Sequence, residues 1–387
     1  MKKIILAICV LCLLTSIPVC AAETAIDSET TNQTEISDET EEQLFSLFDF
    51  SEMEDFISHI FPNEKMGFRE MVQGLISGEI EFTGEFLWNL VSKQFFYEFK
   101  NTKSALVHVL AIVIIAAVFR NFSGVFQNNQ ISEMCFYVLY MLLITICLNS
   151  FRILIAAATS GLSSLLEFLK LLGPVYFMAV ALATGSVTSI AFYNMILILI
   201  CIVELVIQSF LIPLVQVYMV IRILNDLSTE EYLSKFGELL HTVIVWILRT
   251  MLGAVIGINL IQGLLAPAID SVKRSILLRG GEAIPIIGDV IGGASEVVLG
   301  TTVLIKNGIG ASGAIICIAI CMAPVVQMAV VTLMYKLTAA LIQPISEKRI
   351  VGCVSSMADG SEILLRVIFT SGVLFLITIA MVANTTT

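Results

Sequence analysis

Three ionisable side chains lie within one apolar, glycine-rich stretch of the sequence: Asp289, Glu296 and Lys306. A charge in a segment apolar enough to cross a bilayer is unfavourable unless it faces the interior of a helix bundle or a water-filled path. Glycines around such charges permit close helix packing or a break in the helix. The stretch therefore predicts either the polar lining of a pathway or tight helix contact. The surrounding glycines are Gly281, Gly288, Gly292, Gly293, Gly300, Gly308, Gly310 and Gly313.

Two further charges, Glu204 and Arg249, lie inside apolar segments. Either would be unfavourable alone at that depth, so the first expectation is that they pair within the bundle. Gln208 follows Glu204 by one helical turn and extends its polar face. The alternative is that these side chains line a conduction path.

The sequence lacks motifs for catalysis and metal binding. Its three histidines, His59, His108 and His241, form no HExxH pattern, and the cysteines outside the leader form no CxxC pair. Cys317 and Cys321 share a helical face without a nearby histidine, which indicates small packing residues. No P-loop occurs, and Gly288-Asp289 lacks the leading glycine of the GxGD pattern of intramembrane proteases. We therefore expect no enzyme, no catalytic residue, no cofactor and no metal.

The composition predicts that most of the chain lies in a bilayer. Hydrophobic residues make up 57%, the mean hydropathy is +0.94 and 14% of residues are charged, whereas soluble domains carry about 25% charged residues. We predict an all-α polytopic membrane helical bundle of about eight spans over residues 104–387, with an interfacial helix from Arg152 to Lys170. The predicted spans are residues 104–119, 134–151, 172–190, 192–221, 240–266, 285–305, 311–334 and 367–383.

The N-terminal region predicts export. Residues 1–22 have two lysines, an apolar run and a small-residue exit, typical of a signal peptide. Residues 23–43 are acidic and nearly free of apolar residues, which predicts a disordered tether. Residues 44–103 predict a short exported helical region, with one helix ending at Pro62 and another beginning near Thr83. Its position, either packed as a cap or lying on the outer membrane surface, stays open.

Acidic residues are concentrated in the tether and the exported region together, residues 23–103. Residues 23–103 hold eighteen Asp and Glu against five Lys and Arg, a balance of −13. This argues against nucleic acid or anionic lipid as partners of this region. With the mature N-terminus outside the cytoplasm, the predicted inner loops hold eight basic residues and the predicted outer loops hold five, which favours this orientation.

Prolines indicate an internal repeat. Pro174 and Pro213 are 39 residues apart, as are Pro285 and Pro324, and an offset of 111 residues relates the two pairs. We predict that these four prolines break helices and that residues 134–221 and 240–334 form three-span repeats. Because three is odd, the second copy would be inverted in the membrane, an arrangement typical of proteins that form a pathway at the repeat interface.

Four segments resemble the stage III sporulation protein AE family: LNSF at Leu148–Phe151, the pair Pro174 and Pro213, the block Ile284–Gly310, and YKLTAALIQP at Tyr335–Pro344. The resemblance implies a multi-pass component of the channel complex that links mother cell and forespore, in the mother-cell membrane surrounding the forespore. It also implies partners: sister membrane and ring-forming sporulation proteins, and a forespore protein reaching across the intermembrane space. It supplies no catalytic residues.

Two functions remain open at this point. The first is the membrane core of a multiprotein channel or secretion-like apparatus, which the resemblance favours. The second is a self-contained secondary transporter of a small solute that uses the inverted repeat and the region of Glu204 and Arg249.

Overall fold

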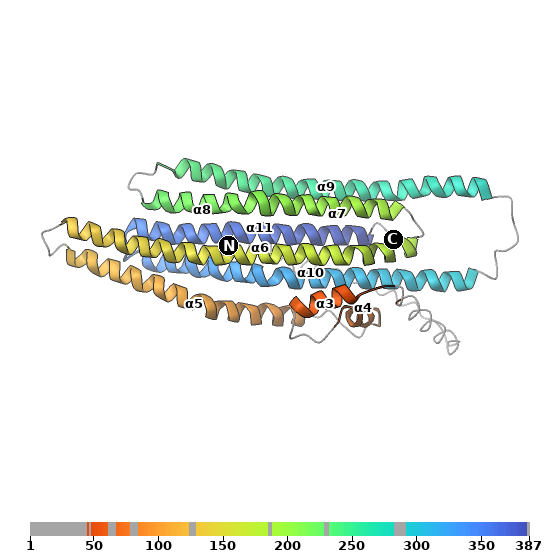
Figure 1. Ribbon diagram of the computed structural model, residues 1–387, viewed down its shortest axis with the longest axis horizontal. Coiled ribbons are helices and arrows are strands. Elements are labelled where there is room, and N and C mark those ends of the chain that lie inside the picture. The colour runs from red at the N-terminus through yellow and green to blue at the C-terminus, as the bar shows by residue number, and fades with distance from the viewer. Residues whose placement is uncertain are drawn as a thin grey trace. The chain divides into compact units, whose positions relative to one another are not determined.

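The computed structural model describes residues 45, 48–60, 67–77, 84–123, 129–184, 188–227, 232–281 and 292–384. The chain divides into two compact units, residues 1–42 and 43–387, and every described residue belongs to the second. The described residues form helices and no strand, which confirms the all-α prediction (Figure 1). The predicted signal peptide and acidic tether lie outside the described residues.

Among the described residues of the exported region the structure shows α3, α4 and the start of α5, where the sequence predicted two helices. Helix α3 (Ser51–Ile60) ends before Pro62, and α5 (Gly84–Ser123) begins one residue after the predicted Thr83. The sequence reading missed α4 (Phe68–Ile76), a nine-residue helix that buries Phe68 and Val72. Helix α5 also continues without interruption through the predicted boundary at residue 103, so the exported region and the predicted first span share one helix.

The start of α3 is fixed by an aspartate. The carboxylate of Asp49 accepts hydrogen bonds from the Ser51 hydroxyl at 2.6 Å and from the Ser51 backbone N–H at 3.0 Å. These bonds stabilise the ionised form and hold the pKa of Asp49 below its ordinary value. They also satisfy one of the backbone donors left open at a helix N-terminus.

Helix α6 (Asn129–Thr184) corrects three predictions at once. The predicted spans 134–151 and 172–190 and the interfacial helix Arg152–Lys170 belong largely to this single helix of 56 residues. Pro174 lies inside it and does not end it. The segment 152–170 contributes buried residues to the bundle, including Leu154, Leu162 and Phe168, so packing on both sides keeps it helical rather than leaving it at an interface.

A π-turn connects the next two helices. Helix α7 (Thr188–Val206) runs into η1 (Ile207–Leu211) and then α8 (Ile212–Leu227). Pro213 is the second residue of α8, just after the π-turn. Proline has no N–H and its ring crowds the preceding carbonyls, and a π-turn widens the helix locally to accommodate it. The break predicted at Pro213 is therefore a local widening of a continuous helical segment.

The last three helices are also longer than predicted. Helix α9 spans Ser234–Gly281, α10 spans Gly292–Ile342 and α11 spans Lys348–Asn384. The predicted spans 285–305 and 311–334 are joined from residue 292 onward in α10, which continues through Pro324. Residues 335–366, predicted as a cytoplasmic loop, mostly belong to α10 and α11. Asp289 and Pro285 lie outside the described residues.

Helix α11 is the centre of the bundle. It packs against α6, α8, α9 and α10, and Figure 1 shows it between α6 and α8. Two clusters of buried apolar side chains result. One joins α5 through α11 around residues such as Tyr140, Tyr335 and Leu364. The other joins α3 and α4 to α6, α10 and the end of α11, with Phe168 and Ile309 fully buried.

Five helical stretches of the described residues are long and apolar enough to cross a membrane, and they are Phe136–Ala183, Ile198–Leu227, Ser234–Ile258, Gly300–Ile342 and Lys348–Ala380. This finding supports a membrane bundle, while the predicted count of eight spans stays a prediction. Helix α6 has 56 residues and would be about 84 Å long, against a hydrocarbon core of about 30 Å. Helix tilts reach only about 40°, so part of such a helix must lie outside the hydrocarbon.

The helices within the two proposed repeats are longer than the separate spans that the sequence predicts. Residues 134–221 contain α6 and the continuous segment α7–η1–α8, and residues 240–334 contain most of α9 and α10. Each proposed copy is therefore built mainly from two long helical segments. The three-span repeats and their inversion stay predictions.

Candidate functional site

The glycine-rich stretch that the sequence singles out is described only in part. Glu296 lies in the first two turns of α10, and its side chain is outside the described set, as is all of Asp289. Lys306 is fully buried, with 0% of its surface exposed, and lies on the same helix. The described residues therefore place one of the three predicted charges inside the bundle.

The glycines beside Lys306 bring helices into close contact. A Cβ added at Gly313 would lie 2.6 Å from Leu172 of α6, and one at Gly310 would lie 3.1 Å from Tyr176. A Cβ at Gly308 would meet Ile76 of α4 at 2.9 Å. Close packing, the plainer of the two predicted roles, therefore describes these three glycines. Gly300 differs, because a Cβ there would meet nothing within 4 Å.

The predicted ion pair between Glu204 and Arg249 is wrong. Glu204 on α7 is 3% exposed, and its Oε1 accepts a hydrogen bond from the Nε2 of Gln208. Arg249 on α9 is exposed and makes no ion pair with Glu204, although the structure describes both residues. Gln208 also donates to the Ser163 hydroxyl of α6 at 3.1 Å. Glu204 is therefore joined to α6 through Gln208 rather than to α9 through Arg249.

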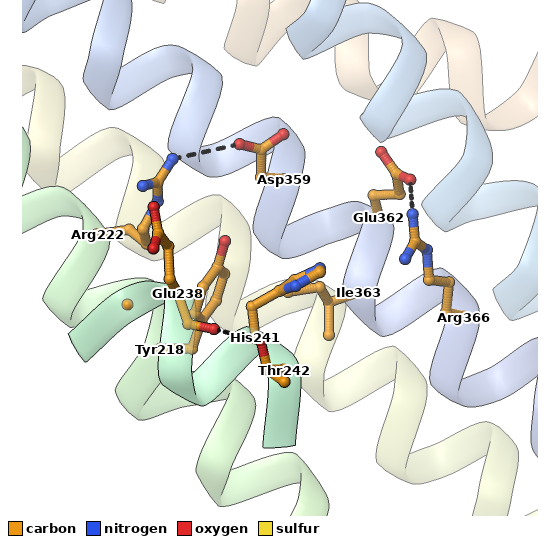
Figure 2. Close-up of a pocket in the computed structure, with 10 residues that line it drawn as sticks. Tyr218, Arg222, Glu238, His241, Thr242, Asp359, Glu362, Ile363 and Arg366 are labelled. Carbon is orange, nitrogen blue, oxygen red and sulfur yellow. Dashed lines mark hydrogen bonds and ion pairs between the residues drawn. The ribbon is translucent and has the colours of Figure 1, made fainter. Parts of the chain in front are cut away.

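A polar pocket lies elsewhere, between α8, α9 and α11 (Figure 2). We call it the α8–α9–α11 pocket; its volume is about 590 Å³. Figure 2 shows Arg222 of α8 reaching toward Asp359 of α11, and the rings of Tyr218 and His241 have centroids 6.1 Å apart. The residues that line it are Tyr218, Arg222, Gly237, Glu238, His241, Thr242, Asp359, Glu362, Ile363 and Arg366.

Ion pairs connect the walls of this pocket. The Arg222 guanidinium lies 3.7 Å from the Asp359 carboxylate and links α8 to α11. Glu362 uses both carboxylate oxygens, one with Lys336 of α10 and the other with Arg366 one turn along α11. The carboxylate is 18% exposed and therefore partly shielded from water, which makes this paired arrangement more stabilising than an exposed pair.

A second polar link lies near the same end of α8. The Ser356 hydroxyl of α11 donates a hydrogen bond to the Asp226 carboxylate of α8. The two helices approach closely here because Gly352 has no side chain: a Cβ at Gly352 would lie 2.9 Å from the Asp226 Cγ. Asn225 meanwhile accepts the backbone N–H of Leu233 at 3.0 Å and orders the turn into α9.

The sequence reading missed this pocket, although a signal for it exists. Asp359, Glu362 and Arg366 are spaced i, i+3 and i+7, so they lie along one face of a helix. Arg222 and Asp226 are likewise four residues apart. The sequence predicted a loop before residue 367, and in a loop the spacing of charged residues does not place them on a common face.

The pocket is suited to holding polar groups rather than to covalent chemistry. Its charged groups of both signs are largely paired with one another, and the described residues contain no cluster of three His, Cys, Asp or Glu side chains able to hold a metal ion. Paired charges in an apolar bundle attract water and polar solutes. The arrangement also ties α8, α10 and α11 together.

Comparison with known proteins gives a consistent assignment. The family model of stage III sporulation protein AE matches residues 66–386. The stage III sporulation protein AE of Bacillus subtilis (strain 168) is 25% identical over 279 residues, which cover 72% of this chain and 70% of that protein. No solved structure matches the chain.

Proposed function

Because this chain belongs to the stage III sporulation protein AE family, we propose that it is a membrane-embedded component of a multiprotein transenvelope channel or secretion-like complex that connects mother cell and forespore. A role in spore development follows from the family itself. The observation that carries the proposal is the family match across the helical bundle, residues 66–386. We propose a non-enzymatic role, without a cofactor.

The lengths of the helices support a partner-binding role. Helices α6 and α10 contain 56 and 51 residues, more than twice the number needed to cross a bilayer. Helical surface must therefore extend beyond the hydrocarbon, where soluble or membrane partners can bind it. Our proposed partners are ring-forming and other membrane proteins of the same sporulation stage, together with a forespore protein across the intermembrane space.

The proposed location is the mother-cell membrane around the forespore, with the mature N-terminus outside the cytoplasm. In this orientation the acidic N-terminal segment and helices α3 and α4 lie on the side that faces the intermembrane space. Buried aromatic residues such as Phe56, Phe68 and Phe168 join these helices to α6, so partner binding to them would act directly on the bundle.

Cross-linking in sporulating cells tests the complex. A tagged chain is cross-linked after engulfment, captured, and its partners identified by mass spectrometry. We expect ring-forming sporulation proteins in the capture, and we expect them to be missing when an unrelated multi-pass protein carries the same tag. Recovery of the chain without sporulation proteins, at normal expression, would contradict the proposal.

One observation keeps a second function in view. Glu204 is buried in an apolar helix without an ion-pair partner among the described residues, as in many transporters that couple solute movement to ions. The alternative is a self-contained secondary transporter of a small solute. Purified chain in liposomes separates the two: solute uptake without any other protein supports the transporter, and uptake that requires captured partners supports the complex.

A further inference from the structure

The carboxyl group of Glu204 is incompletely satisfied. Its side chain is 3% exposed, Gln208 donates to Oε1, and Oε2 is buried without a hydrogen-bond partner among the described residues. A buried carboxylate normally needs two or more donors or a nearby cation to remain ionised. One amide donor leaves the second oxygen of an ionised Glu204 without compensation.

Glu362 provides the contrast within the same bundle. Its two oxygens each meet a cation, Lys336 and Arg366, and all three groups are partly exposed. That arrangement suits a permanently ionised carboxylate. Glu204 has neither paired cations nor comparable exposure, so the two glutamates lie in opposite electrostatic environments.

The charged groups around Glu204 do not change this conclusion. Lys170 of α6 acts on it electrostatically, but this lysine is exposed and forms no ion pair with it. Glu167 of α6 and Arg249 of α9 are exposed and also form no ion pair with Glu204. Solvent or lipid headgroups can reach all three, and their influence on the buried carboxyl group is correspondingly screened.

A polar contact joins Glu204 to the surface of α6. Gln208 lies in the π-turn η1, a feature frequent at functional sites because it re-aims side chains. The Gln208 amide contacts the buried Glu204 on one side and the exposed Ser163 hydroxyl of α6 on the other. The Gln208 amide thus donates to Oε1 of Glu204 on one side and to the Ser163 hydroxyl on the other, while Oε2 of Glu204 stays without a partner among the described residues.

We propose that Glu204 is a reversible proton-binding site inside the bundle, close to the helix surface at Ser163. The ligand is a single proton, which neutralises the carboxylate and is released when the surroundings are more alkaline. Buried ionisable side chains serve as proton sites in membrane pumps and transporters. The proposal concerns the isolated chain and is independent of the channel complex proposed above.

Dicyclohexylcarbodiimide tests the site directly, since it reacts with protonated carboxyl groups in apolar surroundings. The acid adds across the C=N bond of the reagent and transfers its proton to nitrogen, and an O-to-N acyl shift leaves a stable N-acylurea with no other reactant. Full-length chain in detergent is treated across a pH series, digested, and mapped by mass spectrometry. The Glu362 peptide is the internal control.

We expect the adduct on Glu204 and not on Glu362, with labelling about tenfold lower at about pH 9 than at about pH 6. In the variant Gln208→Leu the ionised form loses its one donor, and labelling should persist to a pH about one unit higher or more. The variant Ser163→Ala removes the outer acceptor of Gln208 without touching Glu204, and should leave the pH midpoint of labelling in place.

Three results would overturn the proposal. The first is no adduct at Glu204 at any pH, and the second is an adduct whose yield does not change with pH, which would show a permanently neutral acid. The third is protection by sodium chloride but not by choline chloride, which would show a metal-cation site instead. None of these outcomes depends on whether partners are captured from sporulating cells, so failure here leaves the proposed complex unaffected.

Discussion

Replacing Gly161 with alanine places a methyl group against a rigid neighbour. Gly161 lies on α6 opposite Pro324 of α10, and an added Cβ would lie 2.8 Å from the Cγ of the proline ring and 3.4 Å from its Cβ. Carbon atoms in contact prefer about 3.5–4.0 Å. The ring cannot rotate away as a long side chain can, and Pro324 is itself buried, so the two helices must separate locally.

The magnitude follows from two opposing terms. Alanine is favoured over glycine in a helix interior by about 1 kcal/mol. Overpacking a close contact typically costs about 1–3 kcal/mol. The matched variant Gly253→Ala on α9 gains the helix propensity of alanine without overpacking, because a Cβ there meets nothing within 4 Å. Gly161→Ala should therefore be less stable than Gly253→Ala by about 1–3 kcal/mol.

Thermal unfolding in detergent, followed with a thiol-reactive fluorophore, measures this difference. Cys147, Cys317 and Cys353 are buried and become reactive on unfolding, whereas Cys201 is exposed and sets the baseline. We expect the midpoint of Gly161→Ala to be lower than that of Gly253→Ala by on the order of a few degrees. The double variant Gly161→Ala/Pro324→Ala, which removes the clashing Cγ, should recover part of the loss. Equal midpoints for the two single variants would refute the predicted contact between α6 and α10.

Three further predictions address the bundle and its polar groups. Glu362→Gln should lower the free energy of unfolding by about 1–2 kcal/mol because it leaves Lys336 and Arg366 without their shared partner. The control Glu238→Gln should leave the unfolding midpoint unchanged, since the ion pair of Glu238 with Lys235 is mostly exposed. Equal effects of the two variants would contradict the argument. Gly372→Cys should form a disulfide with Cys321 under mild oxidation, since its Cβ would lie 3.5 Å from the Cys321 Cβ, and Gly257→Cys, with nothing within 4 Å, should remain reduced on non-reducing mass analysis. Alanine at Asp289, Glu296 or Lys306 should lower the yield of heat-resistant spores while the protein remains in the membrane fraction, and normal yields from all three variants would exclude the stretch as the working part.

The sequence predicts the class of fold well and the helix boundaries poorly, for a physical reason. Hydropathy detects apolar segments, so the membrane bundle and most helical positions are correct. It treats every charge as an end, and Arg152, Glu167 and Lys170 therefore divided α6, which the structure shows as one helix. These side chains are exposed on the described helix, where long polar side chains are tolerated without any break in the backbone.

Proline gave a second systematic error. Pro174 and Pro324 were predicted to break helices, yet α6 and α10 continue through them. The structure shows why α10 continues through Pro324. Gly161 of α6 leaves space for the proline ring, so the contact between the two helices stabilises the turn that contains the proline. The glycine and the proline are 163 residues apart, and no local pattern connects them.

The polar groups show the same limit more sharply. Hydropathy places both Glu204 and Arg249 inside apolar segments, so the sequence predicts that the two opposite charges pair. The pairing depends instead on which helices are neighbours and on which face each charge lies. Once α11 is recognised as one helix from Lys348 to Asn384, Glu362 falls between Lys336 and Arg366 and is satisfied. Glu204 makes no ion pair with a described cation. Its environment is set by its own helical segment and by α6, since its described hydrogen bond comes from Gln208, which also donates to Ser163 of α6.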